Sequence, residues 1–194
     1  MTKVMVRDAR HTDLPAITAI YRHAVLHGTA SFELAPPDQD EMRSRFDAMR
    51  TREYPYLVAE TEDGAVAGYA YANAYRPRPA YRWAVENSVY IDDRFQGQGV
   101  GRVLLEALIA RSEALGFRQM IAVIGGSGHK ASIRLHESLG FEMVGVLKGS
   151  GYKFERWLDS VYMQRPLGEG ETTPPDPDAY PGTLYKAAVK AEQS

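Results

Sequence analysis

The sequence predicts an α/β (α+β) domain in which helices and strands are mixed around one sheet. Two strand-like runs, 56–61 and 66–74, flank an Asp63-Gly64 pair, which is a strong hairpin signal. A glycine-rich segment at 96–101 joins a strand-like run to an amphipathic, helix-like run. The run 118–124 is apolar without alternation, as in a strand buried on both faces. Together these signals predict one sheet with helices packed against it.

The first half of the chain is expected to form a strand, two helices and the hairpin. Residues 4–7 form the first strand. Thr12 or Asp13 can cap a helix whose apolar side chains fall on one face, and Gly28 is its expected end. A second, more polar helix starts after 36–38 and continues to about Arg50, before the hairpin begins.

The second half is expected to carry the glycine-rich segment between longer elements. Residues 76–79 (Arg-Pro-Arg-Pro) form a rigid loop, and 81–92 form a long strand. A helix runs from Val100 to its end at Gly116, and a second helix at 130–139 is ended by Gly140. The remaining expected strands are 118–124, 141–147 and 158–163.

The composition changes after Pro166. Residues 1–167 are expected to form the single domain, and 168–194 are expected to form a flexible or arm-like tail, because 168–182 are rich in Gly, Pro, Thr and acidic residues. Residues 184–191 could form a short terminal helix. Whether the tail is disordered or clasps a partner subunit stays open.

The overall composition is that of an ordinary soluble domain and narrows the function classes. A net charge of -2 in 194 residues gives no basis for binding nucleic acid or an acidic membrane. No apolar run approaches the roughly 20 residues needed to span a bilayer, and no signal peptide is evident. The absence of cysteine excludes disulfides, thiolate metal sites and a cysteine nucleophile, and fits a cytoplasmic protein. No metal site is expected.

The glycine-rich segment predicts a site for an anionic group, such as the phosphates of a ligand. Its three glycines allow close approach of the backbone, and the helix that follows directs unpaired N–H groups and the positive end of its dipole at the anion. The alternative is an ordinary tight connection. A Rossmann site would need an acidic residue about 20 positions later, and a Walker loop would need a Gly-Lys-Ser/Thr sequence; neither is present.

Several motifs together resemble the GNAT superfamily of acyl-CoA N-acyltransferases. The segment 129–141 (HKASIRLHESLGF) resembles the helix and turn that end the cofactor site of that superfamily, and Gln96-x-x-Gly99-x-Gly101 matches its pyrophosphate loop. The segments 81–91 (YRWAVENSVYI) and 151–159 (GYKFERWLD) resemble the phosphinothricin and methionine sulfone or sulfoximine acetyltransferase branch. The resemblance covers about residues 3–167. It implies a mixed, mostly antiparallel twisted sheet of about six or seven strands, flanked by about four helices and splayed at the cofactor site.

The resemblance implies acetyl-CoA as co-substrate. In the superfamily, the pantetheine arm adds along a strand that splays from its neighbour, and a bulge frees an N–H for the thioester oxygen. His129 stands where the superfamily usually has asparagine, and neutral histidine likewise offers one donor and one acceptor. The implied cofactor-binding residues are Val89, Tyr90, Ile91, Gln96, Gly97, Gln98, Gly99, Val100, Gly101, Arg102, His129, Ser132 and Ser138.

Two residues are candidates for proton transfer. Glu86 occupies the position of the catalytic glutamate of the resembling branch, and its carboxylate could deprotonate the ammonium form of an amine substrate. Partial burial near Trp83, Val85 and Tyr90 would raise its pKa. His136 stands where many members have a tyrosine acid and could protonate the departing thiolate. The alternatives are a surface glutamate on an edge strand and a histidine that only packs.

The acceptor is expected to be a small amino-acid-like amine. Arginine can hold a carboxylate or phosphinate with two hydrogen bonds, and the candidate substrate-binding residues are Phe32, Arg76, Arg78 and Tyr81. The alternative for the arginines is a solvated loop. Lys153, Arg156 and Trp157 belong either to the acceptor pocket or to a subunit contact, since branch members are often homodimers.

These residues predict an acetyl-CoA-dependent N-acetyltransferase in which the amine attacks the thioester directly. Two alternatives stay open: a protein N-terminal or polyamine acetyltransferase, and a non-catalytic sensor that binds coenzyme A. The arginine-rich loop favours an anionic small acceptor over the first, and the presence of Glu86 argues against the second.

Overall fold

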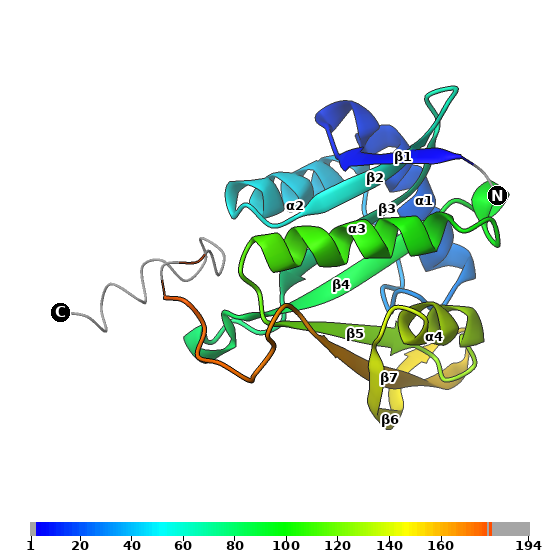
Figure 1. Cartoon of the computed structure of the whole chain (residues 1–194). Helices are drawn as coiled ribbons and strands as arrows, with labels where there is room; N and C mark the ends of the chain where they lie inside the picture. Colours follow the sequence, from blue (N-terminus) through cyan, green and yellow to red (C-terminus); the bar gives the residue numbers. More distant parts are fainter. Residues whose placement is uncertain (1–2, 178, 180–194) are drawn as a thin grey trace.

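The computed structural model describes residues 3–177 and 179 of the chain. Its described part contains one seven-stranded sheet in the order β1-β2-β3-β4-β5-β7-β6 (Figure 1). All neighbouring strands are antiparallel except β4 and β5, which are parallel. The mixed, mostly antiparallel sheet is therefore confirmed. The strands are β1 Val4–Asp8, β2 Tyr56–Thr61, β3 Val66–Ala74, β4 Ala84–Ile91, β5 Gln119–Gly125, β6 Glu142–Lys153 and β7 Arg156–Pro166.

Four α-helices of the described chain cover the two faces of this sheet. α3 (Val100–Ala114) lies across β1–β4 on one face, and α4 (Lys130–Glu137) lies over β5 on the same side (Figure 1). α1 (Leu14–His27) packs on β3 and β4 from the opposite side and contacts α2 (Gln39–Thr51). This arrangement buries the central strands β2 and β3 almost completely, so the middle of the sheet is a rigid support for residues on β4.

The hairpin and most helix starts lie where the sequence predicts them. Residues 56–61 and 66–74 coincide with β2 and β3, and Gly64 has the positive φ of 85° that the turn requires. Asp38 caps α2 by accepting a hydrogen bond from the Glu41 N–H at 2.9 Å. Asp13 lies at the start of α1, but its carboxylate accepts from Arg7 and from the Arg10 N–H instead of capping that helix.

Some predicted bounds are wrong for local reasons. The strand expected from residue 81 begins at Ala84, because Pro79 opens a 3₁₀ turn over Pro79–Tyr81. The helix at 130–139 ends at Glu137. The last two strands, β6 and β7, are longer than 141–147 and 158–163, and they turn through Phe154 and Glu155, which both have positive φ.

The chain after β7 continues along the domain surface for a few residues. Arg118, directly before β5, donates hydrogen bonds to the carbonyl oxygens of Gly170 (2.8 Å) and Thr173 (3.0 Å). The predicted helix at 184–191 lies outside the described residues. In the part of the chain that the structure describes, no helix is long and apolar enough to cross a membrane.

Candidate active site

The site begins where two neighbouring parallel strands separate. The β4–β5 pairing stops at Asn87↔Ala122, although β4 stays paired with β3 up to Ile91 and β5 stays paired with β7 up to Gly125. The backbone groups of the two strands that face each other beyond this point lack a strand partner. A cleft that is open to solvent occupies the gap. Its lining residues are Ala30, Asn87, Ser88, Val89, Tyr90, Ala122, Val123, Ile124, Gly125, His129, Ser132 and His136.

The splay confirms one expectation and corrects another. The sheet is splayed next to the predicted cofactor residues, as the resemblance implies. However, the β3–β4 register runs without a shift from Gly68↔Ile91 to Ala74↔Val85, so β4 carries no bulge against β3. The free N–H groups of β4 arise because its other neighbour, β5, diverges.

Asn87 holds the strands at the point of separation. Its Nδ2 donates to the Ile121 carbonyl oxygen of β5 at 3.0 Å, which turns its Oδ1 toward Nε2 of His136, also at 3.0 Å. Sequence reasoning missed Asn87. The available signal was an asparagine inside a strand, where this residue type is depleted, directly after the candidate base Glu86.

The glycine-rich segment adopts the backbone that its composition predicts. Gly97 and Gly99 have φ of 72° and 90°, and Gly99 is the N-cap of α3 without a side-chain cap. The first turn of α3 therefore presents its N–H groups outward. A Cβ at Gly97 would meet no protein atom within 4 Å, so this side of the loop is open.

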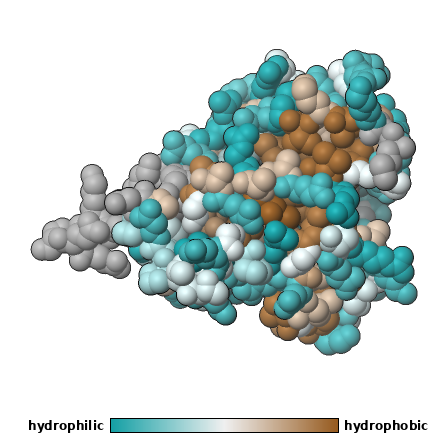
Figure 2. Space-filling view, viewed as in Figure 1, coloured by the Kyte–Doolittle hydropathy of each residue, from teal (hydrophilic) through white to brown (hydrophobic). Residues whose placement is uncertain are grey.

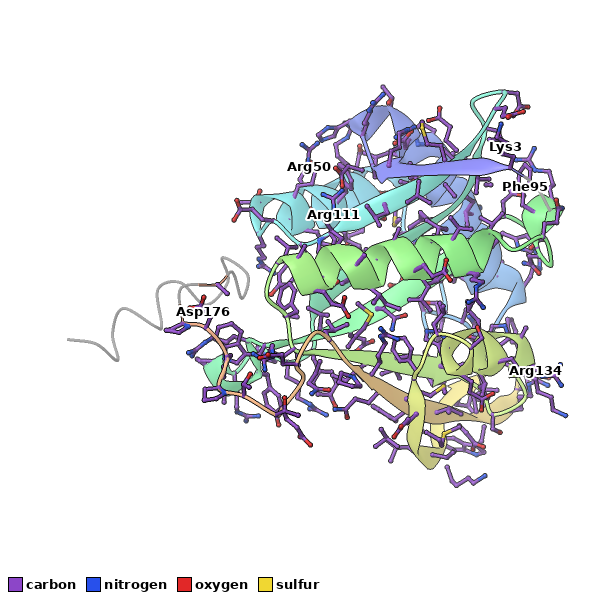
Figure 3. The ribbon with its side chains drawn as sticks, in the orientation of Figure 1. Lys3, Arg50, Phe95, Arg111, Arg134 and Asp176 are labelled. Carbon is purple, nitrogen blue, oxygen red and sulfur yellow. The ribbon has the colours of Figure 1, made fainter. Side chains whose placement is uncertain are left out.

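The glycine loop does not line the cleft itself, but it lies next to α4, which does. A Cβ at Gly101 would come within 3.3 Å of Leu135 on α4, and the Arg102 guanidinium donates to Ser138 Oγ at 3.3 Å. Phe95, next to the loop, and Arg134, on α4, lie toward the same end of the molecule (Figure 3). Backbone groups from the loop and side chains from α4 can thus contact one extended ligand.

The remaining predicted cofactor residues divide into two groups. Val89, Tyr90, His129 and Ser132 line the cleft, and burial lowers the pKa of His129. Ile91 and Val100 do not line it, and Val100 is fully buried in the core. For Val100, only the backbone can contribute to binding.

Glu86 lies on a central strand and not on an edge, which corrects the alternative considered for it. It pairs with Asn73 of β3 on one side and with Ile121 of β5 on the other. Its side chain is half-buried, and burial raises the pKa of its carboxyl group, while the nearby Arg76 charge opposes this shift. A carboxylate with a raised pKa beside a cleft is suited to accept a proton.

The two candidate proton-transfer residues lie on opposite faces of the sheet. Side chains alternate along β4, so Glu86 shares a face with Tyr90, whose ring packs edge-on against Tyr21 of α1 at 5.1 Å. Asn87 points to the other face, where it contacts His136 of α4. The cleft between β4 and β5 can therefore be approached from both faces.

Both ring nitrogens of His136 contact protein oxygens. Nε2 faces Asn87 Oδ1, and Nδ1 lies 2.8 Å from the Ser132 carbonyl oxygen. Only a protonated imidazole could donate to both oxygens. Burial of the side chain, which is 4% exposed, nevertheless lowers the pKa of His136. The two acceptor oxygens thus favour the protonated ring, whereas burial favours the neutral ring.

The predicted acceptor residues come from two loops. In the first, Arg76 lies over the Tyr75 ring at 5.1 Å, and Tyr75 packs edge-on against Tyr81 at 5.8 Å. Arg78 is exposed at the start of the 3₁₀ turn. In the second loop, Phe32 packs against the strands: a Cβ at Gly151 of β6 would overlap its ring.

The described residues contain no group of three or more His, Cys, Asp or Glu side chains that could hold a metal ion.

A second hollow lies at the ends of α2 and α3, where Arg50 and Arg111 are drawn close together (Figure 3). It includes none of the predicted site residues. The splayed strands are therefore the better candidate for the chemistry.

Comparison with known proteins agrees with this geometry. The family model described as an acetyltransferase (GNAT) domain matches residues 6–162. A phosphinothricin N-acetyltransferase of Alcaligenes faecalis is 57% identical over 171 residues, which cover 88% of this chain and 86% of the relative. An L-methionine sulfoximine/L-methionine sulfone acetyltransferase of Pseudomonas paraeruginosa is 44% identical over 169 residues, or 87% of this chain and 98% of the relative.

Solved structures give the same result. The crystal structure of a GNAT superfamily phosphinothricin acetyltransferase from Sinorhizobium meliloti, in complex with AcCoA, superposes with a TM-score of 0.91 at 53% identity. The match covers 96% of this chain and 100% of that chain. The chain therefore belongs to the acetyltransferase (GNAT) domain family.

Proposed function

We propose that this protein transfers an acetyl group from acetyl-CoA to the α-amine of a small amino-acid-like substrate of the phosphinothricin, methionine sulfone or methionine sulfoximine type. The half-buried carboxylate of Glu86, at the point where β4 leaves β5, carries this proposal. The names of the two similar enzymes and the AcCoA in the similar crystal structure support the substrate class and the co-substrate.

The residues of the cleft fit acetyl-CoA. The open N-terminus of α3 and the left-handed glycines suit a diphosphate, and the unpaired edges of β4 and β5 suit the amide groups of pantetheine. When bound, acetyl-CoA supplies the acetyl thioester. Backbone N–H groups of β4 beyond Asn87 would polarise the thioester carbonyl, and such a donor is typically worth about 3 kcal/mol in the transition state.

In the proposed reaction, Glu86 takes a proton from the substrate ammonium group, directly or through water. The free amine then forms the N–C bond as the C–S bond breaks, and the electron pair leaves with the thiolate. The second proton lost from the nitrogen passes to this thiolate, directly or through water, to give the amide and the free thiol. No covalent enzyme intermediate is required. Arg76, Arg78 and Tyr81 would bind the substrate carboxylate or phosphinate, and Phe32 would contact its side chain.

We assign the smaller catalytic role to His136. To protonate the thiolate, its Nε2 would have to exchange Asn87 Oδ1 for the sulfur atom. A thiolate is a fairly good leaving group and needs this proton less than the amine needs the base. In this proposal, Asn87 keeps the imidazole oriented toward the cleft.

We further propose that the protein works as a cytoplasmic homodimer without a nucleic-acid or membrane partner. β6 is the last strand of the sheet, and large apolar side chains are exposed along it, in its turn and at the start of β7: Met143, Val144, Val146, Leu147, Tyr152, Phe154 and Trp157. Apolar surface gathers at this end of the molecule (Figure 2). An exposed apolar edge strand of this length is a typical interaction surface.

A panel of amines tests the proposed function. Thiol release from acetyl-CoA is measured with phosphinothricin, methionine sulfone, methionine sulfoximine, a peptide with a free N-terminus and spermidine, and acetyl-CoA binding is measured by calorimetry. The proposal expects turnover with the amino-acid analogues. Turnover only with the peptide or polyamine would favour the acceptor alternatives, and binding without any turnover would favour a sensor.

A further inference from the structure

The segment 28–33 between α1 and α2, here called the acceptor loop, forms one wall of the cleft. Ala30 lines the cleft, and Thr29 Oγ1 donates to the carbonyl oxygen of Gly125 at 2.8 Å. A Cβ at Gly125 would overlap the Thr29 backbone, so the loop lies directly on the end of β5. The position of Phe32 therefore depends on how firmly this loop is held.

Lys153, at the end of β6, is distant from the acceptor loop in the sequence but binds it in the folded chain. Its ammonium group donates to the carbonyl oxygens of Gly28 (3.0 Å) and Ser31 (2.8 Å), and it lies 5.0 Å from the centre of the Phe154 ring. Only 4% of the residue is exposed. Burying a cation costs free energy unless hydrogen bonds compensate for the lost water. The hydrogen bonds to the two loop carbonyls provide this compensation for the Lys153 ammonium group.

The location of these carbonyls explains why a cation suits the site. Gly28 is the C-cap of α1, so its carbonyl belongs to the negative end of that helix dipole. Burial lowers the pKa of the Lys153 ammonium group, and the negative charge of Glu33, at the end of the loop, opposes this shift and favours the charged form. Glu33 is itself bound to Arg45 of α2 at 2.6 Å. The acceptor loop is thus fastened at both ends.

We propose that Lys153 is a positioning residue: by binding Gly28 and Ser31, it holds the acceptor loop so that Phe32 is placed for the amine substrate. This inference rests on the proposed function, because it assigns the acceptor to the wall that Phe32 forms. It also separates Lys153 from Trp157, which is 70% exposed and lies on the proposed subunit surface. Lys153 touches neither Glu86 nor the glycine loop in any described contact.

The chain's lack of cysteine permits a test by chemical rescue. Lys153→Cys is unfolded, alkylated either with 2-bromoethylamine, which rebuilds an ammonium group of nearly the same reach, or with 1-bromopropane, which leaves a methyl group in its place, and then refolded. Hydrogen–deuterium exchange of residues 28–33 and steady-state kinetics are measured for both adducts. Lys148→Met is the matched control, because Lys148 lies on the same strand and its side chain is 80% exposed.

The propyl adduct should exchange faster in the acceptor loop and show an acceptor KM raised about tenfold, with the KM for acetyl-CoA changed less than about twofold. The aminoethyl adduct should restore both values, and Lys148→Met should resemble the wild type. Equal exchange in the two adducts would overturn the proposal. Faster exchange with an unchanged acceptor KM would also overturn it, because the loop would then not serve the acceptor.

Thr29→Val provides a second, milder variant, because it removes one hydroxyl from the same loop. It should raise the acceptor KM in the same selective way but by a smaller factor, and an unchanged acceptor KM would contradict the role of the loop. If the wild type acetylates no amine of the panel, the proposed function fails. The hold of Lys153 on the loop is then still judged from the exchange rates of the two adducts.

Discussion

Glu86 illustrates how a single side chain obtains its chemistry from its place in the sheet. A carboxylate on an exposed edge would stay ionised down to acidic pH. On a central strand, burial disfavours the charge and raises the pKa, while Arg76 limits the shift. The protonation state of the proposed base is therefore set by two opposing effects, burial and the charge of Arg76.

The first prediction concerns the acid side of the pH profile. A base acts only when deprotonated, so kcat/KM should be lost as the pH falls through the raised pKa of Glu86. Arg76→Gln removes the charge that lowers this pKa, so the midpoint of the acid limb should move to higher pH. Arg82→Gln is the control, because Arg82 lies over the Trp83 ring and does not shift Glu86.

Glu86→Ala should lower kcat by about 10²–10⁴ and abolish this limb. The measurement is thiol release with methionine sulfone from pH 5 to 9. An acid limb that is unchanged in Glu86→Ala would remove Glu86 from the role of base. A limb that moves equally in the two arginine variants would argue against a direct effect of Arg76.

The second prediction separates His136 from Glu86. Because both its ring nitrogens are already bound to protein oxygens, His136→Ala should lower kcat by only about tenfold, below the usual range for general acid–base catalysis. Single-turnover thiol release at neutral pH measures this. A loss as large as that of Glu86→Ala would show that protonation of the thiolate limits the reaction.

At the scale of elements, the glycine loop joins a local backbone requirement to the proposed binding of acetyl-CoA. Gly97 has a left-handed conformation but open space around it, so a methyl group there would strain the backbone and occupy the ligand's side of the loop. Gly64 has a similar φ in the β2–β3 turn, away from the cleft.

The third prediction uses this pair. Gly97→Ala and Gly64→Ala should each lower stability by about 1 kcal/mol, but only Gly97→Ala should weaken acetyl-CoA binding, by about tenfold or more. Thermal unfolding and calorimetry give the two quantities. If Gly64→Ala weakened binding equally, general destabilisation and not the loop would be responsible.

The elements that were predictable from the sequence are those with local signals. An Asp-Gly turn fixes β2 and β3, and glycines mark the start of α3 and the end of α1. The bounds of β6 were not predictable, because Gly145, Gly149 and Gly151 interrupt its pattern and its pairing with β7 shifts twice. That strand is defined by its partner more than by its own residues.

The same distinction applies to the site. Glu86 and His136 could be proposed because family motifs mark them, and the glycine loop because its glycines precede a helix; their roles stay predictions. The contacts of Asn87 with Ile121 and of Lys153 with Ser31 join residues 34 and 122 positions apart, and neither has a local pattern. The motif around Lys153 pointed to this residue, but only its burial shows that it faces the domain interior and Trp157 faces solvent.

At the scale of the whole molecule, the two edges of the sheet differ. β1 is short, at five residues, whereas β6 has twelve residues and its exposed side chains are largely apolar. A stable protein interface buries about 800 Å² per partner with an apolar centre. The β6 edge offers the more extensive apolar surface for a second copy of the chain.

The fourth prediction tests the two edges against each other. Val144→Asp places a charge on the β6 edge, where Val144 is 63% exposed, and should shift a dimer to monomers in sedimentation velocity. Met5→Asp makes the same type of change on β1, where Met5 is 61% exposed, and should leave the assembly unchanged. A monomeric wild type at micromolar concentration, or dissociation by Met5→Asp alone, would contradict a dimer through β6.

The hydrogen bond from Asn87 to Ile121 has a consequence for how the protein would bind acetyl-CoA. Without this hydrogen bond, the two parallel strands could continue their backbone pairing, and the cofactor would have to break that pairing in order to bind. Here the side-chain amide of Asn87 binds the Ile121 carbonyl oxygen, and the β4–β5 pairing ends at this residue. The slot is therefore built during folding, and we expect acetyl-CoA to enter it in a single kinetic step.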